Sequence, residues 1–293
     1  MTDSMDYLAP VLAANAKLGE PGNGDYKDED GLLVCGKCHT RRQSRIRVPT
    51  GPNGEMQEIV VFTQCKCRKE ADEALAEARR RAEEEERHRN LVKHLKKLSL
   101  MDDRMVGHRF DAFQKTQENA TNLKLCRRYA EHFDEMLDRN QGLLMFGSVG
   151  TGKSFSAACI ANHLLDQGIS VMMTSFVRIL NVVQNGKEAD SNLLDQMNRV
   201  KLLIIDDLGA ERGTDYALEK VYHVIDSRYR AKLPIILTTN LTLAEMKAET
   251  ESRYERIYDR IFEMCYPMEY RGISWRKKEA NKRFMEMKSF LEG

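Results

Sequence analysis

Eight consecutive residues, Gly147 to Ser154 (GSVGTGKS), match the phosphate-binding pattern G-x-x-x-x-G-K-[ST]. They follow the apolar run GLLMF and open a helix-forming segment, which is the context that this pattern requires. Glycines let such a loop wrap so that backbone N–H groups and a helix N-terminus face the phosphates. Lys153 is predicted to contact the β- and γ-phosphates of ATP, and Ser154 to ligate Mg²⁺. The loop residues predicted to bind the nucleotide are Gly147, Gly150, Thr151 and Gly152.

Polar residues end two further apolar runs. LLIIDDLG ends in Asp206 and Asp207, and PIILTTN ends in Asn240. Parallel strands bring their carboxyl ends to one sheet edge, so these side chains are expected beside the phosphate loop. Asp206 is predicted to hold Mg²⁺, Asp207 to polarise the attacking water and Asn240 to orient it. Many ATPases of this arrangement carry Glu at the second position, so the shorter Asp207 predicts slow hydrolysis.

Arginines form a second catalytic hypothesis. Arg253, Arg256 and Arg260 recur at helical spacing in ESRYERIYDRIF, which places them on roughly one face. One of them could reach the γ-phosphate in a neighbouring subunit, where a guanidinium stabilises developing charge. The alternative is a solvated surface. Arg276, in SWR at the start of the last helix, could act in the same way within its own subunit.

Four of the seven cysteines are clustered, as Cys35 and Cys38 (C-x-x-C) and Cys65 and Cys67 (C-x-C). They flank a hairpin-like segment, and four thiolates can form a closed tetrahedral Zn²⁺ site. Such a small module with few apolar residues needs a metal to fold. His39 is a competing ligand, although its adjacency to Cys38 makes joint binding awkward. The remaining cysteines read as small buried hydrophobes: Cys126, Cys159 and Cys265.

Alternating apolar runs and helix-forming segments then define the fold class, α/β, a parallel sheet with helices on both faces. Strands are predicted at 142–146, 170–174, 201–206, 234–239 and 265–269. Helices are predicted at 153–167, 175–185, 191–199, 215–231 and 252–263, with one more at the end of the chain.

Composition changes along the chain divide it into four parts. A flexible tail is predicted for 1–30 and the zinc-binding module for 31–67. A charged helical linker rich in Ala, Glu, Arg and Lys follows at 68–104, and the nucleotide-binding domain at 105–293.

The overall composition excludes some classes of protein. The chain has 293 residues, 42% hydrophobic, with 46 basic and 45 acidic side chains and a net charge of +1. No apolar run approaches the ~18 residues of a membrane helix, and no signal pattern opens the chain, so a cytoplasmic protein is expected. The clustered, odd-numbered cysteines also favour a reducing compartment. Near-zero net charge argues against binding nucleic acid through bulk positive charge, so any such contact must be local.

Together these motifs resemble the AAA+ ATPase domain of the DnaC/DnaI-type replicative helicase loaders and their IstB relatives. The resemblance rests on GSVGTGKS, LLIIDDLGAE, YHVIDSRYRAKLPIILTTNL, the ERIYDRI box and the closing SWR. It covers about 105–290. It implies that Lys153, Ser154, Asp206, Asp207 and Asn240 carry the nucleotide chemistry. It also places Arg260, with Arg256 near it, at the inter-subunit arginine and Arg276 at the sensor arginine, with no separate helical lid.

The resemblance implies a function as well. Loaders of this type self-associate through the ATPase domain with ATP between subunits, hold a hexameric replicative helicase and place it on single-stranded DNA. The amino-terminal zinc module is expected to grip the helicase, and DNA to stimulate hydrolysis. Two alternatives stay open. One is an IstB-like transposition helper that binds duplex DNA and recruits a transposase, and the other is a non-catalytic nucleotide-dependent adaptor.

Candidate DNA contacts lie in TSFVRILNVVQNGKEAD, with Phe176 for stacking and Arg178 and Lys187 for phosphates. The alternative is that Phe176 packs in the core and both charges are solvated. The segment RFDAF, with Arg109, Phe110 and Phe113, is a candidate cover for the adenine.

Overall fold

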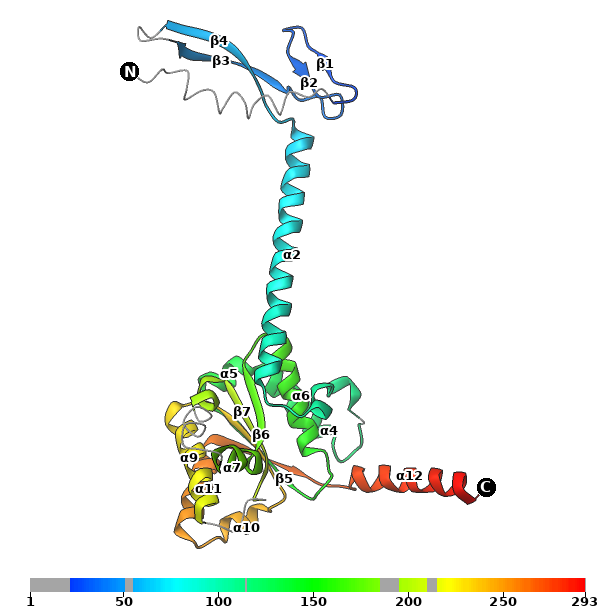
Figure 1. Cartoon of the computed structure of the whole chain (residues 1–293), viewed down its shortest axis with the longest axis vertical. Helices are drawn as coiled ribbons and strands as arrows, with labels where there is room; N and C mark the ends of the chain where they lie inside the picture. Colours follow the sequence, from blue (N-terminus) through cyan, green and yellow to red (C-terminus); the bar gives the residue numbers. More distant parts are fainter. Residues whose placement is uncertain (1–21, 51–54, 114, 185–194, 210–214, 293) are drawn as a thin grey trace. The chain divides into compact units, whose positions relative to one another are not determined.

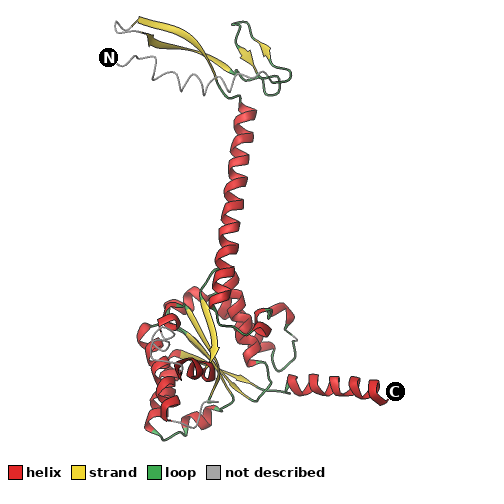
Figure 2. Cartoon of the chain, viewed as in Figure 1, coloured by secondary structure: helices red, strands yellow, loops and turns green. Residues whose placement is uncertain are grey.

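The computed structural model describes residues 22–50, 55–113, 115–184, 195–209 and 215–292. The chain divides into two compact units, Met1–Arg87 and His88–Gly293. Helices and strands of each unit are marked in Figures 1 and 2.

The first unit is built from two short antiparallel sheets. β1 (Tyr26–Lys27) pairs with β2 (Leu33–Val34), and β3 (Gln43–Thr50) pairs with β4 (Glu55–Phe62) from Gln43 opposite Phe62 to Thr50 opposite Glu55. The predicted hairpin is therefore present. α2 (Lys66–Leu98) begins four residues after the end of β4 and has no buried residue, as the charged composition of the predicted linker indicates.

The described part of this unit begins at residue 22, within the segment predicted as a tail (1–30). Asp25 forms a buried ion pair with Arg42 and also accepts hydrogen bonds from the backbone N–H groups of Gly22 and Gly36. These backbone bonds, followed by the Arg42 pair, lower the pKa of the Asp25 carboxyl. Composition alone suggested a tail here, because a Gly- and Asp-rich segment held by polar contacts has no apolar period.

A five-stranded parallel sheet forms the centre of the second unit. Its spatial order is β6-β7-β8-β5-β9, and every neighbouring pair is parallel. The strands are β5 (Gly142–Gly147), β6 (Val171–Ser175), β7 (Leu202–Leu208), β8 (Ile235–Thr239) and β9 (Cys265–Tyr270). All five strands lie within two residues of the predicted ranges. Parallel strands covered on both faces read as continuous apolar runs, which is why sequence could find them.

Helices cover both faces of this sheet (Figure 1). α4, α5 and α6 pack on one face, where Cys126, Phe133 and Ile160 are buried with Met145 and Ile204. α7, α9 and α11 pack on the other, where Phe176, Ile225 and Ile261 are buried with Leu144 and Leu203. The helices of the unit are α3 (Asp103–Val106), α4 (Ala120–Glu131), α5 (Phe133–Asp138), α6 (Lys153–Asp166), α7 (Phe176–Gln184), α9 (Asp215–Ala231), α10 (Leu243–Lys247), α11 (Ser252–Met264) and α12 (Trp275–Glu292), with a 3₁₀ turn η1 at Phe110–Ala112.

These elements confirm the predicted α/β fold class. Residues 191–194 of one predicted helix lie outside the described residues. The three scattered cysteines, Cys126, Cys159 and Cys265, are buried as predicted. In the described ranges, no helix combines the length and the apolar content needed to cross a bilayer.

A buried arginine on α9 connects this helix to the backbone just before two strands, β7 and β8. The Arg228 guanidinium is fully buried and donates hydrogen bonds to the carbonyls of Met197, Val200, Lys201 and Pro234 at 2.7–3.2 Å. Burial lowers its pKa to about 9. The guanidinium therefore provides hydrogen-bond donors for backbone carbonyls in the segment before β7 and in the turn before β8.

Replacement of Arg228 by methionine is expected to lower the free energy of unfolding by about 3 kcal/mol or more, because buried carbonyls lose charged donors. Urea unfolding measures the change. Arg230→Met is the matched control on the same helix, because the Arg230 side chain is 74% exposed, and it should cost less than about 0.5 kcal/mol. Equal stability of the two variants would contradict this role for Arg228.

Candidate functional site

The phosphate loop joins β5 to α6, as predicted. Gly150 in this loop has φ +79°, and a Cβ there would lie 2.2 Å from Ser274 Oγ. The Gly150 carbonyl also accepts a hydrogen bond from the Trp275 N–H at 2.9 Å. Glycine is therefore required both by the left-handed backbone and by the close approach of the residues that start α12. This contact brings α12 to the nucleotide site.

Lys153 lies inside the curve of the loop. Its Nζ donates to the carbonyls of Gly147 and Ser148 at 2.8 and 2.7 Å, and to Asn240 Oδ1 at 2.9 Å. Burial lowers the pKa of Lys153, and the nearby Asp207 and Asp206 oppose that shift. The ammonium group of Lys153 is thus held between the loop and the end of β8, in a position where it could contact a bound phosphate.

Thr238, one residue before the end of β8, contacts both residues of the predicted acidic pair. Its hydroxyl donates to Asp206 Oδ1 at 2.5 Å and accepts from the Asp207 N–H at 3.0 Å. The pairing of β7 with β8 shifts register between Ile205 and Leu208, and Asp207 adopts φ +57°. This local bulge directs the Asp206 side chain to Thr238 and the Asp207 side chain to the hollow that Lys153 lines. Sequence reasoning missed Thr238, although the polar pair in TTN at the end of an apolar strand was a usable signal.

One hollow gathers most of the predicted phosphate-binding groups. It measures about 260 Å³, and among the residues lining it are Gly150, Gly152, Lys153, Ser154, Asp207, Asn240 and Arg276. Partial burial and the Asp206 charge raise the pKa of Asp207, while Arg276 and Lys153 oppose the shift. Arg276 and Asp207 therefore line the same hollow, and the same-subunit role of Arg276 stays a prediction.

A second hollow, of about 270 Å³, adjoins the first. The two share Gly152, Phe155 and Trp275 in their walls, and Phe113 lines the second. The Phe113 and Phe155 rings lie edge to face with centroids 5.4 Å apart. An aromatic hollow beside a phosphate site suits a nucleotide base. Sequence reasoning placed Phe113 here but missed Phe155 and Trp275.

The other two candidates for covering adenine are elsewhere. Phe110 is buried in the core between α4 and α6. Arg109 pairs with Asp166 at 3.0 Å and donates to the carbonyls of Val106 and His108. The prediction was wrong for both residues, because neither lines the aromatic hollow, whereas Phe113, just after the turn η1, does.

Arg260 is engaged within its own chain. Its guanidinium pairs with Asp226 at 2.7 Å and lies over the rings of Tyr222 and Tyr229, at 4.7 and 5.6 Å from their centroids. Arg256 is exposed on the same helix, α11. The side chain of Arg253 lies outside the described residues. The sequence pattern placed three arginines on one helix, but it did not show that Arg260 forms an ion pair with Asp226 on α9.

The predicted DNA contacts separate in the structure. Phe176 is fully buried against the sheet, so the stacking role was wrong and the core alternative holds. Arg178 is exposed, and its Nη1 donates to the Leu100 carbonyl at 2.8 Å. Lys187 lies outside the described residues.

The four clustered cysteines meet in the first unit. Their sulfur atoms all lie within 4.8 Å of one another, the one such group of potential metal ligands in the described part of the chain. Cys35 and Cys38 occupy the turn after β2, and Cys65 and Cys67 lie at the start of α2. His39 is directed elsewhere, since its Nδ1 lies 3.3 Å from the Tyr26 hydroxyl.

Local hydrogen bonds favour thiolates in half of this cluster. The Thr40 hydroxyl, 3.0 Å from the Cys38 sulfur, and backbone N–H groups lower the pKa of Cys38 to about 5. Backbone N–H groups of Cys38 and Lys37 lower the pKa of Cys35. The Cys67 thiol contacts the Cys65 and Cys38 sulfurs, and its pKa is raised to about 12. A divalent cation would offset the repulsion among four thiolates, so the donor set fits Zn²⁺.

The sheet order, the phosphate loop after β5 and the acidic pair at the end of β7 define a P-loop ATP-binding protein of the AAA+ fold. The chain belongs to the family of IstB-like ATP binding proteins, whose model matches residues 68–283.

Two curated relatives are similar over part of the chain. The replicative helicase loader DnaC of Escherichia coli (strain K12) is 30% identical over 142 residues, 47% of this chain and 57% of DnaC. The replicative helicase loader DnaI of Bacillus subtilis (strain 168) is 31% identical over 113 residues, 37% of this chain and 36% of DnaI. The chain thus spans about half, or less, of the length of the relatives it matches.

Solved structures show the same fold. The crystal structure of DnaI matches with a TM-score of 0.51 and 23% identity, over 59% of this chain and 93% of that one. The crystal structure of the DnaC helicase loader matches with a TM-score of 0.50 and 24% identity, over 58% of this chain and all of that one (100%).

Proposed function

We propose that this protein is an ATP-dependent loader that binds a hexameric replicative helicase and places it on single-stranded DNA. The observation that carries the proposal is the hollow that joins Lys153, Asp207, Asn240 and Arg276, in a chain whose curated relatives are named replicative helicase loaders. ATP hydrolysis is part of the proposal, and it would be slow without DNA.

Within this proposal each group of the nucleotide site has a task. The loop N–H groups and Lys153 bind the phosphates, and Ser154 and Asp206 are the residues that would hold Mg²⁺. Bound Mg²⁺ supplies positive charge at the β- and γ-phosphate oxygens. Asp207 and Asn240 orient water, and Arg276 stabilises negative charge that develops on the γ-phosphoryl group. Phe113, Phe155 and Trp275 enclose the base.

The proposal assigns the first unit to the helicase. The zinc-bound form would hold the C-x-x-C turn against the start of α2 and so give a small module a fixed surface. Mixing the protein with its cognate hexameric helicase, single-stranded DNA and ATP should give a complex that elutes as one species. Separate elution of loader and helicase under these conditions would contradict the proposed function.

Self-association through the ATPase domain needs a cation at the neighbouring site. Arg260 would have to leave Asp226 to supply it, whereas the exposed Arg256 would not. We expect Arg256→Ala to lower turnover about tenfold or more without changing the melting temperature. Arg260→Ala should instead lower the melting temperature, because it removes a partly buried ion pair and two ring contacts. If turnover is lost only in Arg260→Ala, and this variant is stably folded, then Arg260 is the inter-subunit arginine, as the sequence predicted.

A transposition helper is the second candidate, because the family is described as IstB-like. Such a protein would coat duplex DNA and recruit a transposase. Electron microscopy with ATP distinguishes the two functions, since filaments on duplex DNA together with no affinity for helicase would favour the helper.

A further inference from the structure

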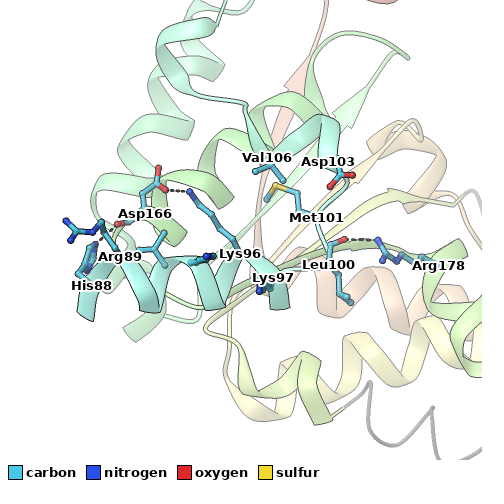
Figure 3. Close-up of a pocket in the computed structure, with 12 residues that line it drawn as sticks. His88, Arg89, Lys96, Lys97, Leu100, Met101, Asp103, Val106, Asp166 and Arg178 are labelled. Carbon is cyan, nitrogen blue, oxygen red and sulfur yellow. Dashed lines mark hydrogen bonds and ion pairs between the residues drawn. The ribbon is translucent and has the colours of Figure 1, made fainter. Parts of the chain in front are cut away.

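A hollow of about 730 Å³ lies in the second unit, apart from both nucleotide hollows. Figure 3 shows the residues that line it. It is formed where the last turns of α2 meet α3, the end of α6 and the start of α7. Half-buried Val92, Leu100, Met101 and Val106 give it apolar walls. It shares no lining residue with the nucleotide hollows.

Three polar contacts fix the walls of this hollow. Lys96 pairs with Asp166 at 2.6 Å, which connects α2 to the end of α6 (Figure 3). The Ser99 carbonyl accepts from the N–H of Met173 in β6 at 2.8 Å. Arg178 donates a hydrogen bond to the carbonyl of Leu100, the residue that follows Ser99 (Figure 3). The hollow is therefore preorganised, and a ligand would not have to order it.

Positive charge is concentrated around the hollow. Lys93 and Lys97 on α2 and Arg178 on α7 line it and are exposed. Among the described residues neither lysine has an ion-pair partner. Of the two carboxylates in the lining, Asp103 and Asp166, the second already pairs with Lys96 and Arg109. Lysines four residues apart on a helix repel each other, so this pair does not stabilise α2.

We propose that this hollow binds the sugar-phosphate backbone of a single strand of nucleic acid. The proposal rests on the proposed function and gives its DNA a position. With a net charge of +1, the chain can attract a polyanion only where cations gather locally. Such cations line two walls of the hollow, Lys93 and Lys97 on α2 and Arg178 on α7. A linear polyanion can therefore lie between them. The apolar walls can contact the sugars and bases of a single strand, whose bases are not covered by pairing as they are in a duplex.

The test measures binding of a fluorescein-labelled oligothymidine to the full chain by fluorescence anisotropy across a salt series with ATP present. For Lys93→Gln/Lys97→Gln we expect about tenfold weaker binding and a salt slope smaller by about 1.4, since each phosphate contact on a single strand contributes about 0.7. The matched control is Lys124→Gln/Arg128→Gln, two exposed cations that are also four residues apart, on α4. Control values should equal those of the unaltered protein.

An unchanged dissociation constant and salt slope in the α2 variant would overturn the proposal. So would a variant that binds DNA normally but loses the helicase, since the hollow would then take an acidic protein surface. If the unaltered protein binds helicase but no oligothymidine, only the nucleic-acid site is overturned. Failure to bind helicase as well would overturn the proposed function itself. Nucleotide affinity of each variant verifies that it is folded.

Discussion

Replacement of Lys153 by alanine is expected to weaken ATP binding by about 100-fold or more and to abolish measurable hydrolysis. The Nζ atom is held by two loop carbonyls and Asn240 at the mouth of the phosphate hollow. Charge-assisted contacts to phosphate are worth about 1.5–3 kcal/mol each, and two of them account for a loss of this size. Isothermal titration calorimetry with ATP measures the affinity, and phosphate release measures turnover.

The Lys153→Ala protein should remain folded. Burial lowers the pKa of Lys153, which shows that the site holds the ammonium against a desolvation cost. Removal of that charge relieves this cost while three hydrogen bonds are lost, so the melting temperature should change little. Lys124→Ala, which removes an exposed lysine from α4, should retain full ATP affinity. Unaltered affinity in Lys153→Ala would refute the nucleotide site, whereas failure to fold would refute this account of the lysine.

The second large effect is expected on chelation of the zinc that we propose at the four cysteines. Chelation should unfold the first unit, because zinc binding to a small thiolate site contributes about 10 kcal/mol or more and few apolar side chains are buried there. Limited proteolysis should then cut within residues 22–65. The second unit should keep its ATP affinity, since it has its own cores on both faces of the sheet.

Metal content provides the control for the chelation experiment. The purified protein should hold one zinc per chain, and Cys38→Ser should hold much less, because the Cys38 thiolate is the one favoured most strongly by local hydrogen bonds. Cys159→Ala alters a cysteine that is buried in the other unit, so its zinc content should equal that of the unaltered protein. A protein without zinc whose first unit resists proteolysis would contradict a structural metal site.

Contiguous motifs could be read from the sequence because neighbouring residues build each of them. The loop from Gly147 to Ser154 carries its own glycines and lysine, and the apolar runs ahead of it and of Asp206 identify buried parallel strands. The cysteine spacing likewise identified four cysteines whose sulfur atoms lie together. The relative order of these segments then fixed the sheet edge at which they meet, since parallel strands end on the same side.

Side chains that depend on distant partners could not be assigned in this way. Phe110 and Phe113 stand three residues apart in one short segment, yet one enters the core and the other lines a hollow. Arg260 and Arg256 share a helix, but Asp226, on α9, holds only the first.

The sequence by itself therefore determined the fold class, the phosphate loop and the cysteine cluster. Only the tertiary structure decided which aromatic rings line the second hollow, that Thr238 contacts both residues of the acidic pair, and that Arg260 is engaged in its own chain. The physical reason is that periodicity shows whether a side chain is buried, but its partner depends on contacts between elements far apart in the chain. The hollow beside α2 is decided in the same way, because its cations come from helices separated by about eighty residues, as Lys97 and Arg178 show.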